Sequence, residues 1–145
     1  MISDNINRKA ILDVYKNAHI AMQSISNLLP EVNDLELKNE LLYQFDGYKS
    51  FIDEVDYYLK EKGIEPEDIN LFQKTMMKGA IKFKTMIDAS RNHVADMMIK
   101  GSVMGINELA QMNNESKNYD KEIADFIARL LNLEEEYERR LKKFL

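Results

Sequence analysis

The sequence predicts an all-α protein, a four-helix bundle with a long crossover connection between the second and third helices. Four segments carry apolar residues at three- and four-residue steps, the period of an α-helix. Five glycines and two prolines among 145 residues leave few turn signals, which argues against many short strands. This length suits one domain, residues 1–145, with its own apolar core.

The first two helices are predicted from their caps and apolar stripes. The first runs from about Ile6 to Leu29, with Ser3 or Asp4 as its cap, and Pro30 closes it. Its apolar face comprises Ile11, Val14, Ala18, Met22, Ile25 and Leu29. The second helix starts after the capping sequence Asn33-Asp34-Leu35-Glu36 and ends at Gly63, a residue suited to the left-handed position after a helix. Its seam comprises Leu41, Phe45, Tyr48, Ile52, Val55 and Leu59.

From Asp68 to Asn114 the apolar residues keep the period of an α-helix, and no clear helix-ending signal interrupts them. The capping-box spacing of Thr85 to Asp88 suggests a restart. We therefore expect an extra helix, Asp68–Lys84, and a third bundle helix, Met86–Asn113. The alternative is one overlong helix in an up-down-up-down bundle. The fourth helix begins between Ser116 and Asp120 and reaches the C-terminus.

The lengths of the connections predict the direction of each helix. The short loops near Pro30 and Asn114 join antiparallel neighbours. The stretch from Gly63 to Thr85, an extended piece followed by a helix, spans roughly 40 Å, about the length of the bundle. The second and third helices should therefore run parallel, which is the one-crossover arrangement.

Three stretches carry a resemblance to a known family. They are Gln44 to Pro66, whose long helix ends in Gly-Ile-Glu-Pro, then Asn92 to Glu108, then Glu134 to Leu141. Together they outline the chain, which resembles the ferritin-like superfamily and, more closely, its small bacterial four-helix bundles. The resemblance implies ferritin-like connectivity.

The resemblance also implies where metal ligands would stand. Metal-binding members carry an inward Glu on helices one and three, and Glu-x-x-His on helices two and four. Here helix four reads Glu134-x-x-Tyr137, and Lys100 lies near the expected carboxylate of helix three. Helix two offers Glu40-x-x-Tyr43 or Gln44-x-x-Gly47. Both histidines of the pattern are missing, so an inherited di-iron centre is not expected.

A nonstandard metal site is the alternative. Counted along the crossover bundle, His19, Gln44, His93 and Glu134 fall within a turn of one level. Imidazole and carboxylate together suit iron, manganese or zinc. The competing interpretation, which we favour, is a polar rim of satisfied hydrogen bonds without a metal or other cofactor.

Methionine and glycine have separate interpretations. Seven of the nine methionines lie between Met76 and Met112. The pair His93 and Met97 has a spacing compatible with Cu(I), but packing into irregular gaps is the simpler account, and an adaptable binding surface is a third. Gly47 predicts a close approach or a bend. Gly101 and Gly105 predict close packing of helix three on a neighbour, or a dimer contact.

Composition narrows the function classes. The net charge is −5 without a basic face, so a nucleic-acid partner is not expected. The chain has no cysteine, no membrane-length apolar run and no signal-peptide pattern, which favours the cytoplasm. We expect a non-enzymatic bundle that forms a homo-oligomer or binds a helical protein partner. The alternative is a metal-binding protein or oxidoreductase that uses Glu134 with His19 and His93.

Overall fold

The computed structural model describes residues 4–66 and 90–145, which are helical and contain no strand. Four α-helices form the bundle: α1 (Asp4–Leu28), α2 (Leu35–Glu61), α4 (Arg91–Asn114) and α5 (Lys121–Leu141). Short 3-10 turns follow α1, α4 and α5. The all-α, four-helix prediction is confirmed, whereas the predicted extra helix, Asp68–Lys84, lies outside the described residues.

The ends of the first two helices agree with the sequence signals. α1 ends at Leu28 and passes into a 3-10 turn that contains Pro30. The Asp34 carboxylate caps α2 by accepting a hydrogen bond of 2.9 Å from the Leu37 amide. Gly63 follows α2 with a φ of 65°, the left-handed conformation that glycine adopts without steric cost.

The predicted start of the third bundle helix is wrong. α4 begins at Arg91 rather than Met86, because Ser90 has an extended backbone with φ −62° and ψ 151°. The Ser90 hydroxyl donates a hydrogen bond of 2.8 Å to the Asn92 side chain. The extended backbone of Ser90 interrupts the helical pattern at a position that was not predicted. No continuous helix therefore passes through Ser90. The proposed restart at Thr85 lies outside the described residues.

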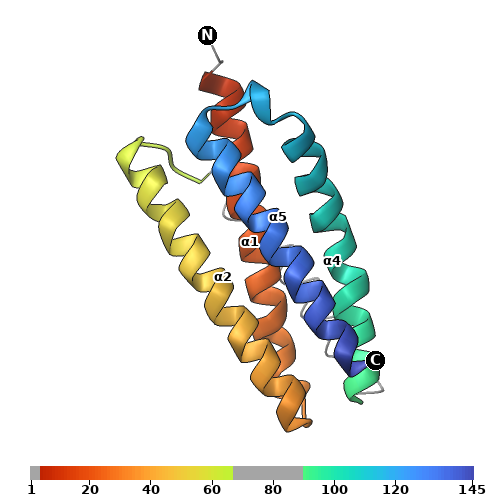
Figure 1. The fold of residues 1–145 in the computed structure, drawn as a ribbon. Helices are drawn as coiled ribbons and strands as arrows, with labels where there is room; N and C mark the ends of the chain where they lie inside the picture. The colour runs from red at the N-terminus through yellow and green to blue at the C-terminus, as the bar shows by residue number, and fades with distance from the viewer. Residues whose placement is uncertain (1–3, 67–89) are drawn as a thin grey trace.

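Contacts at the two ends of the bundle fix the helix directions. Arg91, at the start of α4, lies 3.1 Å from Glu36 and 3.6 Å from Asp34 at the start of α2. At the other end, Asn7 of α1 accepts a hydrogen bond of 2.9 Å from the Asp120 amide, which precedes α5. α2 and α4 therefore run in the same direction, and α1 and α5 run in the opposite one (Figure 1).

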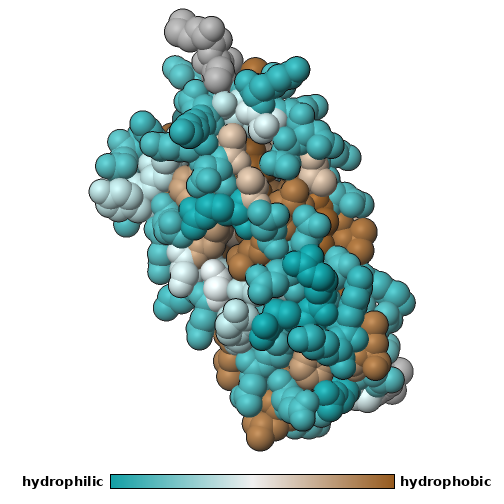
Figure 2. Space-filling model, viewed as in Figure 1, coloured by the Kyte–Doolittle hydropathy of each residue, from teal (hydrophilic) through white to brown (hydrophobic). Residues whose placement is uncertain are grey.

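An apolar core fills the space between the helices. Fully buried members from each helix are Ile11, Val14, Ile25, Leu37, Leu41, Val55, Val94, Leu109, Ile123, Ile127 and Leu130. The face in Figure 2 is mainly polar, with apolar side chains gathered in a few patches. Within residues 4–66 and 90–145, no helix combines the length and apolar character that crossing a membrane requires.

Candidate functional site: a cleft between α1 and α4

A cleft of about 630 Å³ opens between α1 and α4. Its floor consists of three buried side chains, Gln44, Tyr48 and Glu134, which come from α2 and α5. The α1 wall comprises Asn17, Ile20, Ala21, Ser24 and Ile25. The α4 wall comprises Met98, Gly101, Ser102, Met104, Gly105, Asn107, Glu108 and Gln111. The volume is in the range of small-molecule binding sites.

Glu134 is the buried charged residue of the cleft, and only 3% of its surface is exposed. Burial, and then the negative charge of Glu108, raise the pKa of Glu134 to about 8. Desolvation acts this way because it penalises the ionised carboxylate more than the neutral acid. At neutral pH the floor of the cleft therefore carries a carboxyl group that is largely protonated.

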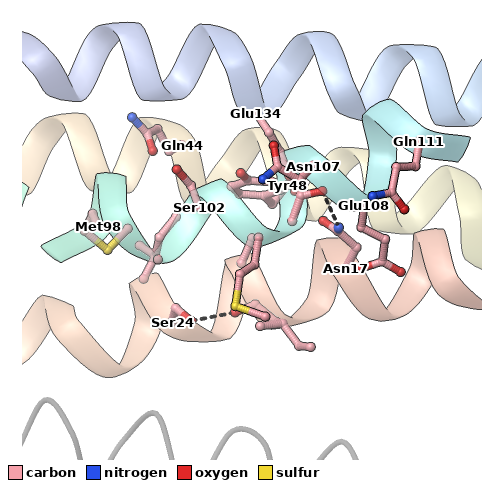
Figure 3. A pocket seen from close by; sticks show the side chains of 16 residues that line it. Asn17, Ser24, Gln44, Tyr48, Met98, Ser102, Asn107, Glu108, Gln111 and Glu134 are labelled. Atoms are coloured by element: carbon pink, nitrogen blue, oxygen red, sulfur yellow. Dashed lines mark hydrogen bonds between the residues drawn. The ribbon is translucent and has the colours of Figure 1, made fainter. Parts of the chain in front are cut away.

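The Glu134 carboxyl reaches the cleft because α4 has no side chain opposite it. A Cβ atom built on Gly105 would lie 3.2 Å from Glu134 Oε1 and 3.5 Å from Asn17 Oδ1. The Asn17 amide nitrogen donates a hydrogen bond of 3.2 Å to the Gly105 carbonyl, which fixes the side chain (Figure 3). Two polar oxygens, from α1 and α5, thus lie beside one glycine of α4.

Gln44 connects the cleft floor to an ion pair at its edge. The Gln44 side-chain nitrogen is 3.1 Å from Glu40 Oε2 and 3.4 Å from the Tyr137 carbonyl. Glu40 in turn accepts hydrogen bonds of 2.9 and 3.0 Å from Arg140 Nε. The Arg140 guanidinium also lies over the Tyr43 ring, 4.3 Å from its centre. These contacts hold Gln44 in one orientation, so its amide is a fixed part of the floor.

Tyr137 is buried where the metal-binding pattern would place a histidine. Its hydroxyl lies only 1.7 Å from the position that a Gly47 Cβ would take. Its ring packs edge-on against Tyr48, with the ring centres 5.2 Å apart. The prediction of a close approach at Gly47 is confirmed. The absence of a side chain at Gly47 makes room for the Tyr137 hydroxyl, so these two residues pack against each other.

The structure separates the four metal-ligand candidates into two groups. Gln44 and Glu134 both line the cleft floor. His19 instead packs edge-on against Tyr15, 4.4 Å between ring centres, on the side of α1 where the charge of Asp56 reaches it. Burial lowers the pKa of His19, which favours the neutral imidazole.

The predicted common level of His93 and Glu134 is wrong. Gly105 is the α4 residue beside Glu134, and His93 precedes it by twelve residues, about 18 Å along the helix. The prediction failed because helices two to four were aligned by counting residues from their ends, and α4 starts five residues later than expected. Within the described ranges, no three acidic, histidine or cysteine side chains converge as metal ligands.

The remaining predicted features have mixed outcomes. Glu108 is exposed at the cleft rim, and Lys100 pairs with Asp96 on the surface at 2.8 Å. Gly105 packs closely against α1 and α5, but Gly101 faces open space. Met104 is 82% exposed at the rim, which agrees with the interpretation of an adaptable surface.

Neither Asn17 nor the α1–α4 cleft was predicted from the sequence. A signal for both was present in the pattern. Asn17, Ala21 and Ser24 form a small and polar stripe on α1 at four- and three-residue steps, and Gly101 and Gly105 form a matching stripe on α4. Two facing stripes of small residues leave a gap between helices unless the backbones approach closely.

Comparison of the chain with models of protein families, with curated proteins and with solved structures finds no match.

Proposed function

We propose that this protein is a non-enzymatic helical bundle that acts by binding other molecules in the cleft between α1 and α4. The observation that carries the proposal is the composition of the floor. A cleft of about 630 Å³ ends on Glu134, Gln44 and Tyr48, each at most 5% exposed. Such a combination of apolar walls and a few convergent polar groups is typical of binding pockets.

Ferritin-like ancestry is part of the proposal, and two observations support it. α2 and α4 run parallel, as a one-crossover bundle requires. The motif positions Gln44-x-x-Gly47 and Glu134-x-x-Tyr137 also face each other across the bundle, through the Gly47–Tyr137 contact and the hydrogen bond from Gln44 to the Tyr137 carbonyl. A crossover helix between α2 and α4 belongs to the same proposal.

The geometry favours binding over metal-dependent catalysis. Of the ligands that a nonstandard iron, manganese or zinc site would use, Glu134 lies in the cleft, whereas His19 and His93 do not line it. An amide, Gln44, and a glycine, Gly47, stand at the helix-two positions where a carboxylate and an imidazole would be needed.

A second copy of the chain or a helical partner remains an alternative occupant under this proposal. Met104 (82% exposed) lines the cleft, and its neighbour on α4, Val103 (43%), is also exposed, so the two supply apolar surface to which a helix could bind. The proposal places the protein in the cytoplasm, which the absence of cysteine supports.

The decisive experiment combines elemental analysis with fragment binding observed by NMR. The purified full chain should hold no stoichiometric transition metal. In ¹⁵N-labelled protein, small amphiphilic fragments should shift the amide signals of Gly101, Ser102 and Gly105. A tightly held metal at one equivalent, or fragment shifts that avoid all three amides, would overturn the proposal.

A pair of variants localises the binding to the cleft. Gly101→Phe should abolish the shifts, since a side chain at Gly101 meets open cleft space rather than protein atoms. Lys100→Phe adds the same ring at an exposed neighbour that does not line the cleft, and it should leave binding unchanged. Equal binding to both variants would place the fragments elsewhere.

A further inference from the structure

The charges around the cleft are unbalanced. Glu134 lies on the floor and Glu108 at the rim, and no lysine, arginine or histidine among residues 4–66 and 90–145 lines the cleft. The cations that act on Glu108 are Lys16 and Lys9 of α1, and Lys9 already pairs with Asp13 at 2.8 Å. In the described part of the chain, no cation offsets the effect of burial on Glu134. A buried carboxyl without a cationic partner favours a positively charged ligand over a negative one.

Polar atoms of Glu134 and Asn17 converge in the cleft beside Gly105. Glu134 Oε1 and the Asn17 amide nitrogen each lie 3.2 Å, and Asn17 Oδ1 lies 3.5 Å, from the position that a Gly105 Cβ would take. The Asn17 nitrogen donates to the Gly105 carbonyl and also hydrogen-bonds to the Glu108 carboxylate, which leaves the Asn17 oxygen as the group available to a ligand. Figure 3 shows Glu134 and Asn17 approaching this region from opposite sides. A group with several N–H donors would satisfy both oxygens at once.

The rest of the cleft is suited to hydrocarbon. Ile20, Ala21 and Ile25 of α1 and Met98 and Met104 of α4 form the apolar parts of its walls. Methionine side chains adapt to ligands of different shape because they are unbranched and flexible. A ligand with a short alkyl chain and a compact polar head would therefore match the cleft along its length.

From this arrangement we infer that the cleft binds a primary alkylammonium ion, with the ammonium group on Glu134 and Asn17 and the alkyl chain along the apolar walls. This inference rests on the proposed function and names its ligand class. The ammonium group supplies three donors, and its charge makes the hydrogen bond to Glu134 stronger than one from a neutral alcohol.

Binding is coupled to the protonation of Glu134. Because its pKa is about 8, the free carboxyl is mostly neutral at pH 7. The bound ammonium stabilises the carboxylate, so the Glu134 proton passes to the solvent while the ligand keeps all three of its own. The other ionisable groups facing this region are Tyr48 of α2, Glu108 of α4, and Lys9, Asp13 and Lys16 of α1.

Isothermal titration calorimetry with three ligands of equal chain length tests the inference. Hexylammonium chloride, 1-hexanol and sodium hexanoate are titrated into the full chain at pH 7, in phosphate and in Tris. Hexylammonium should bind at least about tenfold more tightly than 1-hexanol, and hexanoate most weakly. The difference in heat between the two buffers should report the release of close to one proton for hexylammonium alone.

Two matched variants test whether the preference for hexylammonium over 1-hexanol depends on the Glu134 carboxyl. Glu134→Gln keeps the shape of the side chain and should reduce the preference for hexylammonium over 1-hexanol to less than about threefold. Glu136→Gln makes the same change at an exposed site and should leave the preference intact. Gly101→Phe, which blocks the cleft, should weaken hexylammonium and 1-hexanol together, and it serves as a second test if Glu134→Gln does not fold.

The outcomes separate the inference from the proposed function. If 1-hexanol binds in the cleft as tightly as hexylammonium, or if Glu134→Gln keeps the preference, the inference is overturned and the cleft remains a binding site. If hexylammonium does not bind at all, the inference is also overturned, and the fragment shifts at Gly101, Ser102 and Gly105 decide the proposed function separately.

Discussion

The hydroxyl of Tyr137 occupies the place where a side chain at Gly47 would begin. A Cβ atom at Gly47 would lie 1.7 Å from the hydroxyl oxygen and 3.0 Å from the ring carbon that bears it. No adjustment of a few tenths of an ångström relieves such an overlap. Tyr137 is 4% exposed and packs on Tyr48, so the ring has little room to withdraw.

Gly47→Ala should therefore destabilise the protein. Alanine favours the helix by about 1 kcal/mol over glycine, but the overlap with Tyr137 should cost more, for a net loss of about 1–3 kcal/mol. Urea denaturation of the variant measures it. Adding Tyr137→Phe, which removes the overlapping oxygen, should recover part of the loss. Strictly additive effects of the two substitutions would contradict the contact.

Gly101 provides the matched control, because a Cβ atom there meets no atom of residues 4–66 and 90–145 within 4 Å. Gly101→Ala should raise the free energy of unfolding by about 0.5–1 kcal/mol through helix propensity alone. The two alanine variants should thus shift the urea midpoint in opposite directions. A shift of the same sign in both would mean that the cleft is closed at Gly101.

Glu134 should make the stability of the protein fall as the pH rises. Its pKa is about 8 in the folded chain, against an ordinary value of 4.5. Below pH 4.5 the group is protonated in both states. Between pH 4.5 and 8 the unfolded chain releases the proton and the folded chain keeps it, so stability is progressively lost, by roughly 5 kcal/mol in total.

Urea denaturation at pH 5, 7 and 8.5 measures this loss. Glu134→Gln cannot ionise and should remove most of the decline, so that it is more stable than the wild type at pH 8.5. Glu136→Gln, at an exposed site, should follow the wild type. If Glu134→Gln declines as steeply as the wild type, another group is responsible.

The ion pair between Glu40 and Arg140 should contribute measurably to stability. The Glu40 side chain is 10% exposed and that of Arg140 34%, and the two are joined by contacts of 2.8 to 3.0 Å. Glu40→Gln should cost about 1–3 kcal/mol, because it weakens charge-assisted hydrogen bonds in a partly buried place. Asp13→Asn breaks the exposed pair with Lys9 and should cost less than about 0.5 kcal/mol in the same denaturation assay. An equal loss of stability in Glu40→Gln and Asp13→Asn would contradict the larger contribution of the partly buried ion pair.

Distances between spin labels test the parallel course of α2 and α4. Labels at the exposed residues Glu36 and Asn92 should lie close together, since Arg91 contacts Glu36. Labels at Lys60 and Asn92 should be farther apart by roughly 30 Å, nearly the length of α2. Pulsed electron paramagnetic resonance measures both. An antiparallel pair of helices would reverse the order of the two distances.

Local signals in the sequence predicted the helices and which side chains point inward. Asp34 and Gly63 mark the ends of α2 because a capping carboxylate and a left-handed glycine act within one turn of chain. Glu134 and Tyr137 are both buried on α5, because the apolar stripe of this helix fixes its orientation about its own axis.

The amino-acid sequence by itself thus determined an all-α bundle of four helices and the ends of α2. Only the tertiary structure decided which residues face Glu134. An apolar stripe repeats at every turn, so it does not fix the position of one helix along the axis of its neighbour. Packing across the bundle, including Tyr137 against Gly47, selects one alignment. In that alignment Gly105 and Asn17, rather than His93 and His19, lie beside the Glu134 carboxyl.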